Sequence, residues 1–532
     1  MARLRTEPVL AGGLALLSAW LVYAAAVRNG FAYDDVVIVT GDPRITQFQF
    51  SSIFTKPYWS APGFALYRPI VSLSFAADWA LSNGSAAWFH VINAVWHGLA
   101  TAALFALLLA WFTVPASLAA ALVFAVHPVH VEAVANVVGR AELMAAAFGL
   151  LACALWAHER PRSRPGRALL VMLCVALALL CKESSAVLPA LFVLIDAARQ
   201  RWSSFRDLPG YLRSRAPELA ALMLMVVGAT ALRGAVAGGL APTQLDPVME
   251  VMPSAAARIR TAFQIWPEFI RLLFFPRVLL ADYGPLVTMP LDGWTLRALG
   301  GMFLALTSVM LGLWLLDQKR SLAALALLWF PITILPVANL IVPIGILLAE
   351  RTLYFPSAAL AFAVALGWRW ITAHRPTLVP AATAVCVIVL ALLAGRTIAR
   401  VPEWDSTDRI MTAQLRDRPD SFRAVWHSAR MAKRDQKPRE ALELYARAAR
   451  LWPWRERLIV EAAAYAAQQG DARFALQLSR HGTVRWPGNL QLQRLVAGNA
   501  LDLGDTTTAR HALDAGLRLA PNDSLLRRMA AA

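Results

Sequence analysis

Two adjacent acids, Asp34 and Asp35, follow the first apolar segment of the chain. Because neighbouring carboxylates repel each other, a site that holds both must supply cations or a proton. One of the two has the chemistry of a general base, which accepts a proton from a hydroxyl group. Taken alone, the pair is more typical of a solvated loop or a helix cap, so its interpretation depends on the polar residues elsewhere in the chain.

A second group of polar residues comes shortly afterwards. Arg68 lies in the sequence Leu66-Tyr-Arg-Pro69, and His90, Asn93 and His97 follow it. The last three are spaced i, i+3 and i+7, so they share one face of a helix. Ionisable side chains on a membrane helix are costly and belong by default to a functional site or to the interior of a bundle. We therefore expect this face to support the acids.

Two more histidines and a glutamate lie close together at His127, His130 and Glu132. Two imidazoles and a carboxylate form a ligand set for a divalent metal, but this spacing is not specific and no cysteine assists it. Hydrogen-bonded structural histidines are the competing interpretation. The sequence leaves a metal site open as one of two alternatives.

Three pairs of charged residues occupy the ends of apolar segments. These pairs are Arg140 with Glu142, Lys182 with Glu183, and Glu350 with Arg351. Each could be an ion pair that only locks helices together. In the topology derived below all three fall on the outward side of a membrane. A membrane protein that gathers acids, arginines and histidines at one surface is expected to bind an anion there.

Membrane helices must position these side chains. The chain has 532 residues, of which 58% are hydrophobic and only 16% charged, whereas soluble domains are roughly half apolar and a quarter charged. A helix needs roughly 20 apolar residues to cross a bilayer. Eleven candidate spans lie near 8–27, 87–112, 115–135, 141–157, 168–181, 184–198, 217–233, 296–316, 322–341, 352–370 and 377–398.

Basic loops predict the orientation, because Lys and Arg stay on the cytoplasmic side. The basic segments are Arg3/Arg5, 158–167, 199–215, Lys319/Arg320 and 369–375. Placing all of them inside makes 261–281 a re-entrant or interfacial helix, with the N-terminus in and the C-terminus out. The outward segments are then 28–86, 234–260 and everything after about Val401, and 48–59 suits a helix lying on the membrane surface.

The net charge of +17 also has a topological explanation. The part from Val401 onward holds 21 Lys and Arg against 15 Asp and Glu, which leaves +11 for the membrane part. No basic stripe with interleaved aromatic residues is present, so nucleic acid is not an expected partner. The four cysteines lie in apolar runs without ligand spacing and are interpreted as small core residues.

The C-terminal part repeats with a period of 34 residues. Pro419, Pro453, Pro487 and Pro521 keep this interval, and so do Ala441, Ala475 and Ala509. Small residues at helix contacts, with a proline that ends each unit, are the signature of tetratricopeptide repeats. About three repeats are expected to stack into a solenoid whose concave face binds a partner peptide, or which only braces the membrane part.

Seven stretches of the membrane part run in one order. They are Tyr33-Asp-Asp35, Tyr67-Arg-Pro-Ile70, His90 to His97, His127 to Glu142, Cys181-Lys-Glu183, Pro336-Val-Ala-Asn339 and Ala349 to Pro356. Together with the repeats they resemble the transmembrane and tetratricopeptide-repeat O-mannosyltransferase-like family, within the C-type glycosyltransferase fold. The resemblance covers almost the whole chain. It implies an all-α bundle of about 11 spans in residues 1–400, followed by a tetratricopeptide α-solenoid in 401–532.

The resemblance also implies an activity and assigns roles to residues. The activity is transfer of a sugar, with mannose as the first candidate, from a polyprenyl-phosphate donor to a hydroxyl acceptor with inversion. Asp34 or Asp35 matches the catalytic acid of the family, with a preference for Asp34. The candidates for binding the donor phosphate are Arg68, Arg140, Lys182 and Arg351. The supporting residues are His90, Asn93, His97, His127, His130, Glu132, Glu142, Glu183 and Glu350.

The setting and the partners follow from the same resemblance. The composition, rich in alanine and arginine, suits a bacterium, so the chain is expected in the inner membrane with its active site and repeats on the periplasmic side. Its partners would be a membrane lipid carrier and an acceptor protein or peptide docked on the repeats. No cofactor is required by the motifs, and a divalent metal stays open.

Elementary chemistry supports the same activity. A lipid phosphate, with a second pKa near ~6 by analogy with phosphoserine, leaves without a general acid. Fixed arginines on its oxygens stabilise the departing charge, while an aspartate across the sugar takes the acceptor proton and the transition state is oxocarbenium-like. Three alternatives remain: a transporter or flippase, a scaffold that displays the repeats, and a transferase with a lipid or glycan acceptor. We find no inverted internal repeats, which the transporter would favour.

Overall fold

The computed structural model describes residues 3–61, 63–158, 165–200, 202, 204–243, 245, 247–285 and 289–531. All regular elements in these ranges are helices. The chain divides into two compact units, Met1–Ile410 and Met411–Ala532. Residues 401–410 pack with the first unit because the side chain of Asn29 and the N–H of Gly30 donate hydrogen bonds to the carbonyls of Val401 and Asp405, at 2.9 Å and 3.0 Å.

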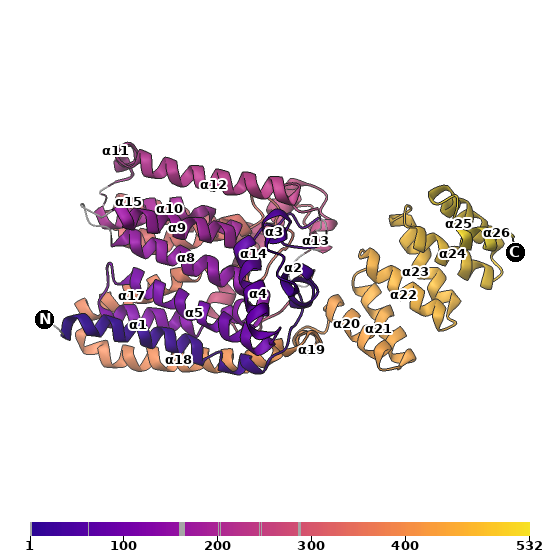
Figure 1. Ribbon diagram of the computed structural model, residues 1–532, viewed down its shortest axis with the longest axis horizontal. Helices are drawn as coiled ribbons and strands as arrows, with labels where there is room; N and C mark the ends of the chain where they lie inside the picture. The colour runs from indigo at the N-terminus through magenta and orange to yellow at the C-terminus, as the bar shows by residue number, and fades with distance from the viewer. Residues whose placement is uncertain are drawn as a thin grey trace. The chain divides into compact units, whose positions relative to one another are not determined.

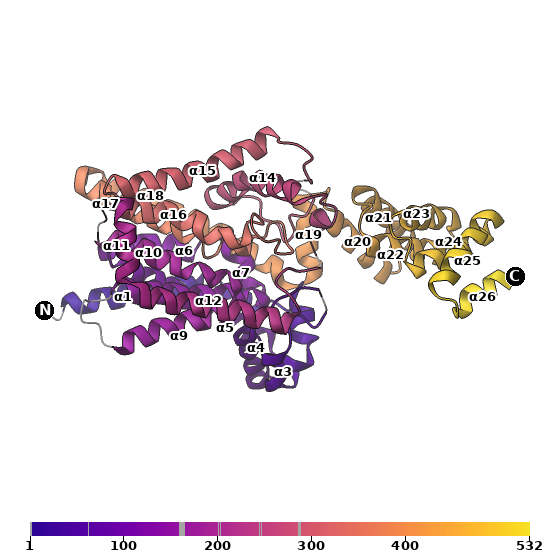
Figure 2. The ribbon, with the colours of Figure 1, turned by 90° about the horizontal axis from the view of Figure 1, so that it is seen from above.

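The first unit is a bundle of long apolar helices with short helices at one end. Its α-helices are α1 Arg3–Leu21, α2 Pro43–Thr46, α3 Phe50–Thr55, α4 Pro69–Ser82, α5 Ala86–Leu108, α6 Val114–Ala125, α7 Val131–Ala135, α8 Arg140–Ala157, α9 Pro165–Cys181, α10 Leu188–Gln200, α11 Leu208–Ser214, α12 Ala216–Ala237, α13 Pro247–Glu250, α14 Ala255–Phe274, α15 Leu296–Asp317, α16 Ser321–Ile334, α17 Ala358–His374 and α18 Val379–Arg400. Figures 1 and 2 show α1, α9, α12, α15 and α18 running roughly parallel to one another, with α3 and α4 at the end away from the N-terminus.

Five helices of the described residues are long and apolar enough to cross a membrane, or six if the bent pair Val114–Ala125 and Pro128–Ala135 counts as one span. The break of 49° in this pair falls at residues 126–127, directly before Pro128, and proline removes a backbone donor and disfavours a straight helix. Shorter apolar helices occupy Thr6–Leu21, Gly166–Cys181 and Ser321–Val337. The eleven spans expected from the sequence are therefore only partly matched by length and composition. Most of the predicted loop 158–167 lies outside the described residues.

Residues 261–274 of the expected re-entrant segment 261–281 belong to α14, which is not among the helices apolar enough to span. It is amphipathic: it carries Arg258, Glu268 and Arg271, and buries Ile265 and Phe269. Its neighbour α15 approaches it so closely at Gly301 that a Cβ there would lie 1.8 Å from the carbonyl oxygen of Phe263. Only glycine permits this contact, which fixes α14 against the bundle.

The second unit consists of paired helices at a fixed interval. They are α20 Phe422–Arg434, α21 Pro438–Leu451, α22 Glu456–Gln468, α23 Ala472–Arg485, α24 Leu490–Asp502, α25 Thr506–Leu519 and α26 Ser524–Ala531, preceded by α19 Thr407–Asp417. The first helices of successive pairs begin 34 residues apart, at Phe422, Glu456 and Leu490. The periodic alanines at 441, 475 and 509 are buried between the helices, because a larger side chain would separate packed helices.

Candidate active site

The loop after α1 carries the acid pair, and hydrogen bonds join this loop to the segment 401–407. Tyr33 has a φ of 55°, a left-handed conformation that is unusual for a bulky residue and is held only by surrounding contacts. Its N–H donates to Thr407 Oγ1 at 2.8 Å. The N–H of Gly30 likewise donates to the carbonyl of Asp405. This turn presents the two neighbouring carboxylates to different partners.

Asp35 is fully buried and binds the backbone. It accepts hydrogen bonds from the N–H groups of Val138 at 2.8 Å and Val137 at 3.2 Å, directly before α8. The first N–H groups of a helix have no partner within it, and an aspartate is well suited to cap them. The Asn93 amide donates to the carbonyls of Val134 and Val137 in the same turn, both at 3.2 Å. Asp35 is thus a positioning residue for the turn that begins α8.

This burial gives the fold a pH dependence. Burial raises the pKa of the Asp35 carboxyl to about 7, although the N–H of Val138 works in the opposite direction. Because the folded chain keeps this proton to a higher pH than the unfolded chain, the stability contribution is full in acid and is lost as the pH rises toward about 7. We expect Asp35→Asn to flatten the fall in melting temperature between about pH 4 and about pH 7, measured by thermal unfolding of the purified protein. Asp317→Asn at the end of α15 should keep the original slope, and an unchanged slope in Asp35→Asn would contradict the assignment.

Asp34, unlike its neighbour, is partly exposed and faces a cation. Its Oδ2 lies 3.8 Å from Nη1 of Arg351, and 23% of its side chain is exposed. Nη1 of Arg351 also donates to Glu132 Oε1 at 2.9 Å, while the N–H of Arg351 donates to Glu132 Oε2. Burial lowers the pKa of Arg351, but the charges of Glu132 and Asp34 outweigh it and raise that pKa. This brings a partly exposed carboxylate and a fixed guanidinium side by side.

Glu350, next to Arg351, points elsewhere. Its Oε1 accepts hydrogen bonds from the Tyr283 hydroxyl at 2.7 Å and the N–H of Leu280 at 2.5 Å. The side chain is fully buried, and burial raises the pKa of its carboxyl to about 8. Glu350 therefore ties the segment after α14 to η8 (Glu350–Leu353), the short helix that carries Arg351.

Lys182 and Glu183 are also neighbours in the sequence that bind different partners. Lys182 has extended backbone, with φ −159° and ψ 135°, so it and its neighbour point in opposite directions. Lys182 pairs with Glu142 of α8, and both side chains are buried. The Glu183 carboxylate accepts hydrogen bonds from Nε and Nη2 of Arg68, at 3.2 Å and 2.9 Å. Burial alone would raise the pKa of Glu183, but the Arg68 guanidinium lowers it below its usual value.

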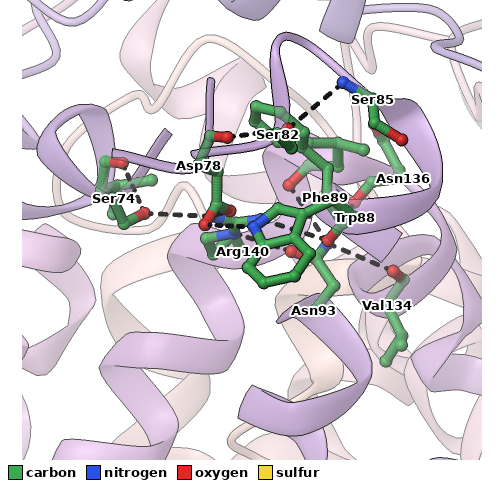
Figure 3. A network of polar contacts seen from close by, with 12 residues as sticks. Ser74, Asp78, Ser82, Ser85, Trp88, Phe89, Asn93, Val134, Asn136 and Arg140 are labelled. Atoms are coloured by element: carbon green, nitrogen blue, oxygen red, sulfur yellow. Dashed lines mark hydrogen bonds and ion pairs between the residues drawn. The ribbon is translucent and has the colours of Figure 1, made fainter. Parts of the chain in front are cut away.

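Arg140, one of the predicted phosphate-binding residues, is enclosed within the bundle. It is fully buried, pairs with Asp78, and donates to Asn93 Oδ1 at 2.8 Å and to the carbonyl of Phe89 at 3.1 Å (Figure 3). All its donor nitrogens are occupied, so it joins α4, α5 and α8 rather than reaching a ligand. Lys182 is buried in the same way. Of the four predicted cations, Arg68 and Arg351 are the two with partly exposed side chains, at 14% and 21%.

The predicted histidines are buried structural links. On α5, His90 and His97 share one buried face with Asn93, as expected, and bind the carbonyls of Gly30 and Ala125. His97 Nδ1 also lies 2.6 Å from the Tyr354 hydroxyl. These contacts tie α5 to the first loop, to the end of α6 and to the segment before α17.

The candidate metal ligands are not gathered into a site. His127 binds the carbonyl of Leu273 and accepts the N–H of Val129, His130 contacts the Ser357 hydroxyl, and Glu132 binds Arg351. Across the described ranges, no three His, Cys, Asp or Glu side chains are grouped to hold a metal ion. Each of these three side chains has a hydrogen-bond partner within the protein.

Sequence reasoning missed Tyr58, Asp78 and Arg233. The sequence could have indicated Asp78, because it is the single charged residue in the apolar helix α4. Nε of Arg233, on α12, donates a hydrogen bond to the carbonyl of Ala65 at 2.9 Å. The charge of Arg233 also lowers the pKa of Glu183. Neither Tyr58 nor Arg233 lies in a pattern that distinguishes it from other aromatic or basic residues.

Comparison with known proteins finds relatives of one kind, the protein O-mannosyl-transferases. It is 28% identical over 401 residues to a protein O-mannosyl-transferase of Caenorhabditis elegans, covering 72% of this chain and 54% of that protein. It is 27% identical over 460 residues to protein O-mannosyl-transferase TMTC3 of Mus musculus, covering 80% and 49%. No family model matches. The solved structure of ArnT from Cupriavidus metallidurans bound to undecaprenyl phosphate superposes with a TM-score of 0.39 and 13% identity, over 86% of this chain and 80% of that one, a score too low to establish a shared fold.

The apolar helices and the helical bundle define a multi-pass membrane protein. The chain is a homologue of the TMTC protein O-mannosyl-transferases. It spans about half the length of the curated relatives it matches.

Proposed function

We propose that this chain is a glycosyltransferase that moves a sugar from a polyprenyl-phosphate carrier to a hydroxyl group of a protein. Mannose is the first candidate, because the relatives are named protein O-mannosyl-transferases. The observation that carries the proposal is the approach of Asp34 Oδ2 to Arg351 Nη1, at 3.8 Å, with both side chains partly exposed. A base beside a guanidinium is the minimum that transfer from a lipid phosphate needs.

The reaction assigns a role to each of these groups. The acceptor oxygen attacks the anomeric carbon while the bond from that carbon to the phosphate oxygen breaks, so the configuration inverts. Asp34 accepts the proton of the acceptor hydroxyl. Arg351 and Arg68 hold the phosphate oxygens and stabilise the charge that leaves with the lipid. Both arginines are already oriented by carboxylates, Glu132 and Glu183, so little reorganisation is needed when the donor arrives.

The proposed setting is the periplasmic side of a bacterial inner membrane. The acid loop lies at the end of the bundle away from the N-terminus (Figure 1), and a cytoplasmic N-terminus then places the site outside. We assign residues 1–400 to a transferase domain of the C-type glycosyltransferase fold and 401–532 to a tetratricopeptide solenoid. The 34-residue interval between its helix pairs supports that solenoid, and we assign it the docking of an acceptor protein or peptide.

A donor panel tests the activity. The purified full-length protein is incubated with polyprenyl-phosphate-linked mannose, glucose, galactose and N-acetylglucosamine, and both released polyprenyl phosphate and glycosylated protein are measured. We expect the mannose donor to be consumed fastest and the product to have the opposite anomeric configuration. Transfer to a glycolipid but not to protein would change the acceptor class, and no consumption of any donor would overturn the proposal.

A further inference from the structure

Tyr58 has a buried hydroxyl without a partner beside the site. Only 3% of the residue is exposed, and its hydroxyl makes no hydrogen bond within the described part of the chain. Buried polar groups are nearly always hydrogen-bonded, so each exception needs an explanation. Tyr67, nine positions on, shows the ordinary arrangement, because its hydroxyl donates to the carbonyl of Phe54 at 2.9 Å.

The backbone of Tyr58 is held in place by a dedicated contact. Arg44 is paired with Asp42 and both are buried. The Arg44 guanidinium also donates to the carbonyls of Pro57 and Tyr58, at 3.0 Å for the latter. The N–H of Tyr58 donates to the carbonyl of Leu66 at 2.7 Å. A buried ion pair therefore binds the two backbone carbonyls at and before Tyr58, and it fixes the position of this residue.

The aromatic ring of Tyr58 lies near charged groups of the candidate site. The Arg68 guanidinium lies over the ring, with Cζ 5.3 Å from the centroid. Burial raises the pKa of the Tyr58 phenol, and the charges of Arg68, Arg351, Asp34 and Asp35 all act on it. The phenol therefore stays protonated at neutral pH and can only donate its proton to a bound anion.

We propose that the Tyr58 hydroxyl donates a hydrogen bond to a phosphate oxygen of the lipid-linked donor, between the guanidinium groups of Arg68 and Arg351. This rests on the proposed function and deepens it by adding a neutral donor to the two cations. A phosphate oxygen would satisfy the hydroxyl that the empty site leaves without a partner. The hydroxyl also selects for a phosphate, because a third donor beside two arginines suits an acceptor with several oxygens.

Tyr58→Phe tests the proposal, with Tyr67→Phe as the matched control. Binding of polyprenyl phosphate and of inorganic phosphate to each full-length protein is measured in nanodiscs, together with the melting temperature. We expect Tyr58→Phe to bind polyprenyl phosphate about ten- to a hundredfold more weakly, the loss typical of a hydrogen bond to a charged group. Its melting temperature should be equal or higher, since an unsatisfied buried hydroxyl has been removed. Tyr67→Phe should keep the affinity and melt at a lower temperature.

The other outcomes distinguish failure of the inference about Tyr58 from failure of the proposed function. Unchanged affinity in Tyr58→Phe, or a fall in its melting temperature like that of Tyr67→Phe, would make the hydroxyl structural and overturn the inference alone. Equal competition by inorganic phosphate would show that the ligand is not the lipid phosphate. A wild-type protein that neither binds polyprenyl phosphate nor transfers sugar would overturn the proposed function together with the inference.

Discussion

Replacing Asp34 with asparagine is expected to lower the rate of sugar transfer by about a thousandfold, within the range that general bases contribute. Asparagine is nearly isosteric but cannot accept the acceptor's proton. The partner Arg351 keeps its bond to Glu132, so donor binding should change little. The loss should therefore appear in kcat rather than in KM for the donor, measured by initial rates with the purified protein.

Two further variants define what the Asp34 result means. Asp317→Asn, an exposed carboxylate at the end of α15, should transfer at the rate of the original protein. Asp34→Glu keeps the base but displaces it, and should recover part of the activity. If Asp34→Asn transferred sugar within a fewfold of the original rate, Asp34 would not be the base and the proposed mechanism would fail.

The choice between Asp34 and Asp35 illustrates what the sequence could predict. Adjacent carboxylates at the end of a span indicated a candidate site, and the family resemblance gave only a preference for Asp34. The structure adds the left-handed turn at Tyr33 and the N–H groups of Val137 and Val138, which bury one acid and leave the other partly exposed. These partners lie about a hundred residues away, so no local pattern could reveal them.

Charged neighbours in the sequence proved to be separate in space. Arg140 and Glu142 look like an ion pair on one helix, yet Arg140 pairs with Asp78 and Glu142 with Lys182. Side chains two positions apart on a helix do not face each other. The face formed by His90, Asn93 and His97 was predictable because its three members are spaced at helical intervals and all are buried. Periodicity thus predicts faces well, whereas it does not predict partners across the bundle.

The second large effect is expected at Arg351. Replacing it with lysine keeps the charge but removes the planar fork of donors that can span a carboxylate and a phosphate together. We expect Arg351→Lys to lower kcat about a hundredfold, comparable to the removal of one transition-state hydrogen-bond donor, in the same initial-rate measurement. The matched control is Arg320→Lys, an exposed arginine before α16, which should transfer normally.

The decisive variant removes Arg351 together with the carboxylate that it neutralises. Arg351→Gln alone leaves Glu132 buried and unpaired, and a buried charge without its partner is strongly destabilising. Glutamine at both positions removes that cost, so the double variant should regain much of the melting temperature of the original protein. It should still fail to transfer sugar, because the leaving phosphate has lost its guanidinium. Recovery of transfer in the double variant would mean that Arg351 serves only to neutralise Glu132, and the assignment of a phosphate-binding role to it would then be wrong.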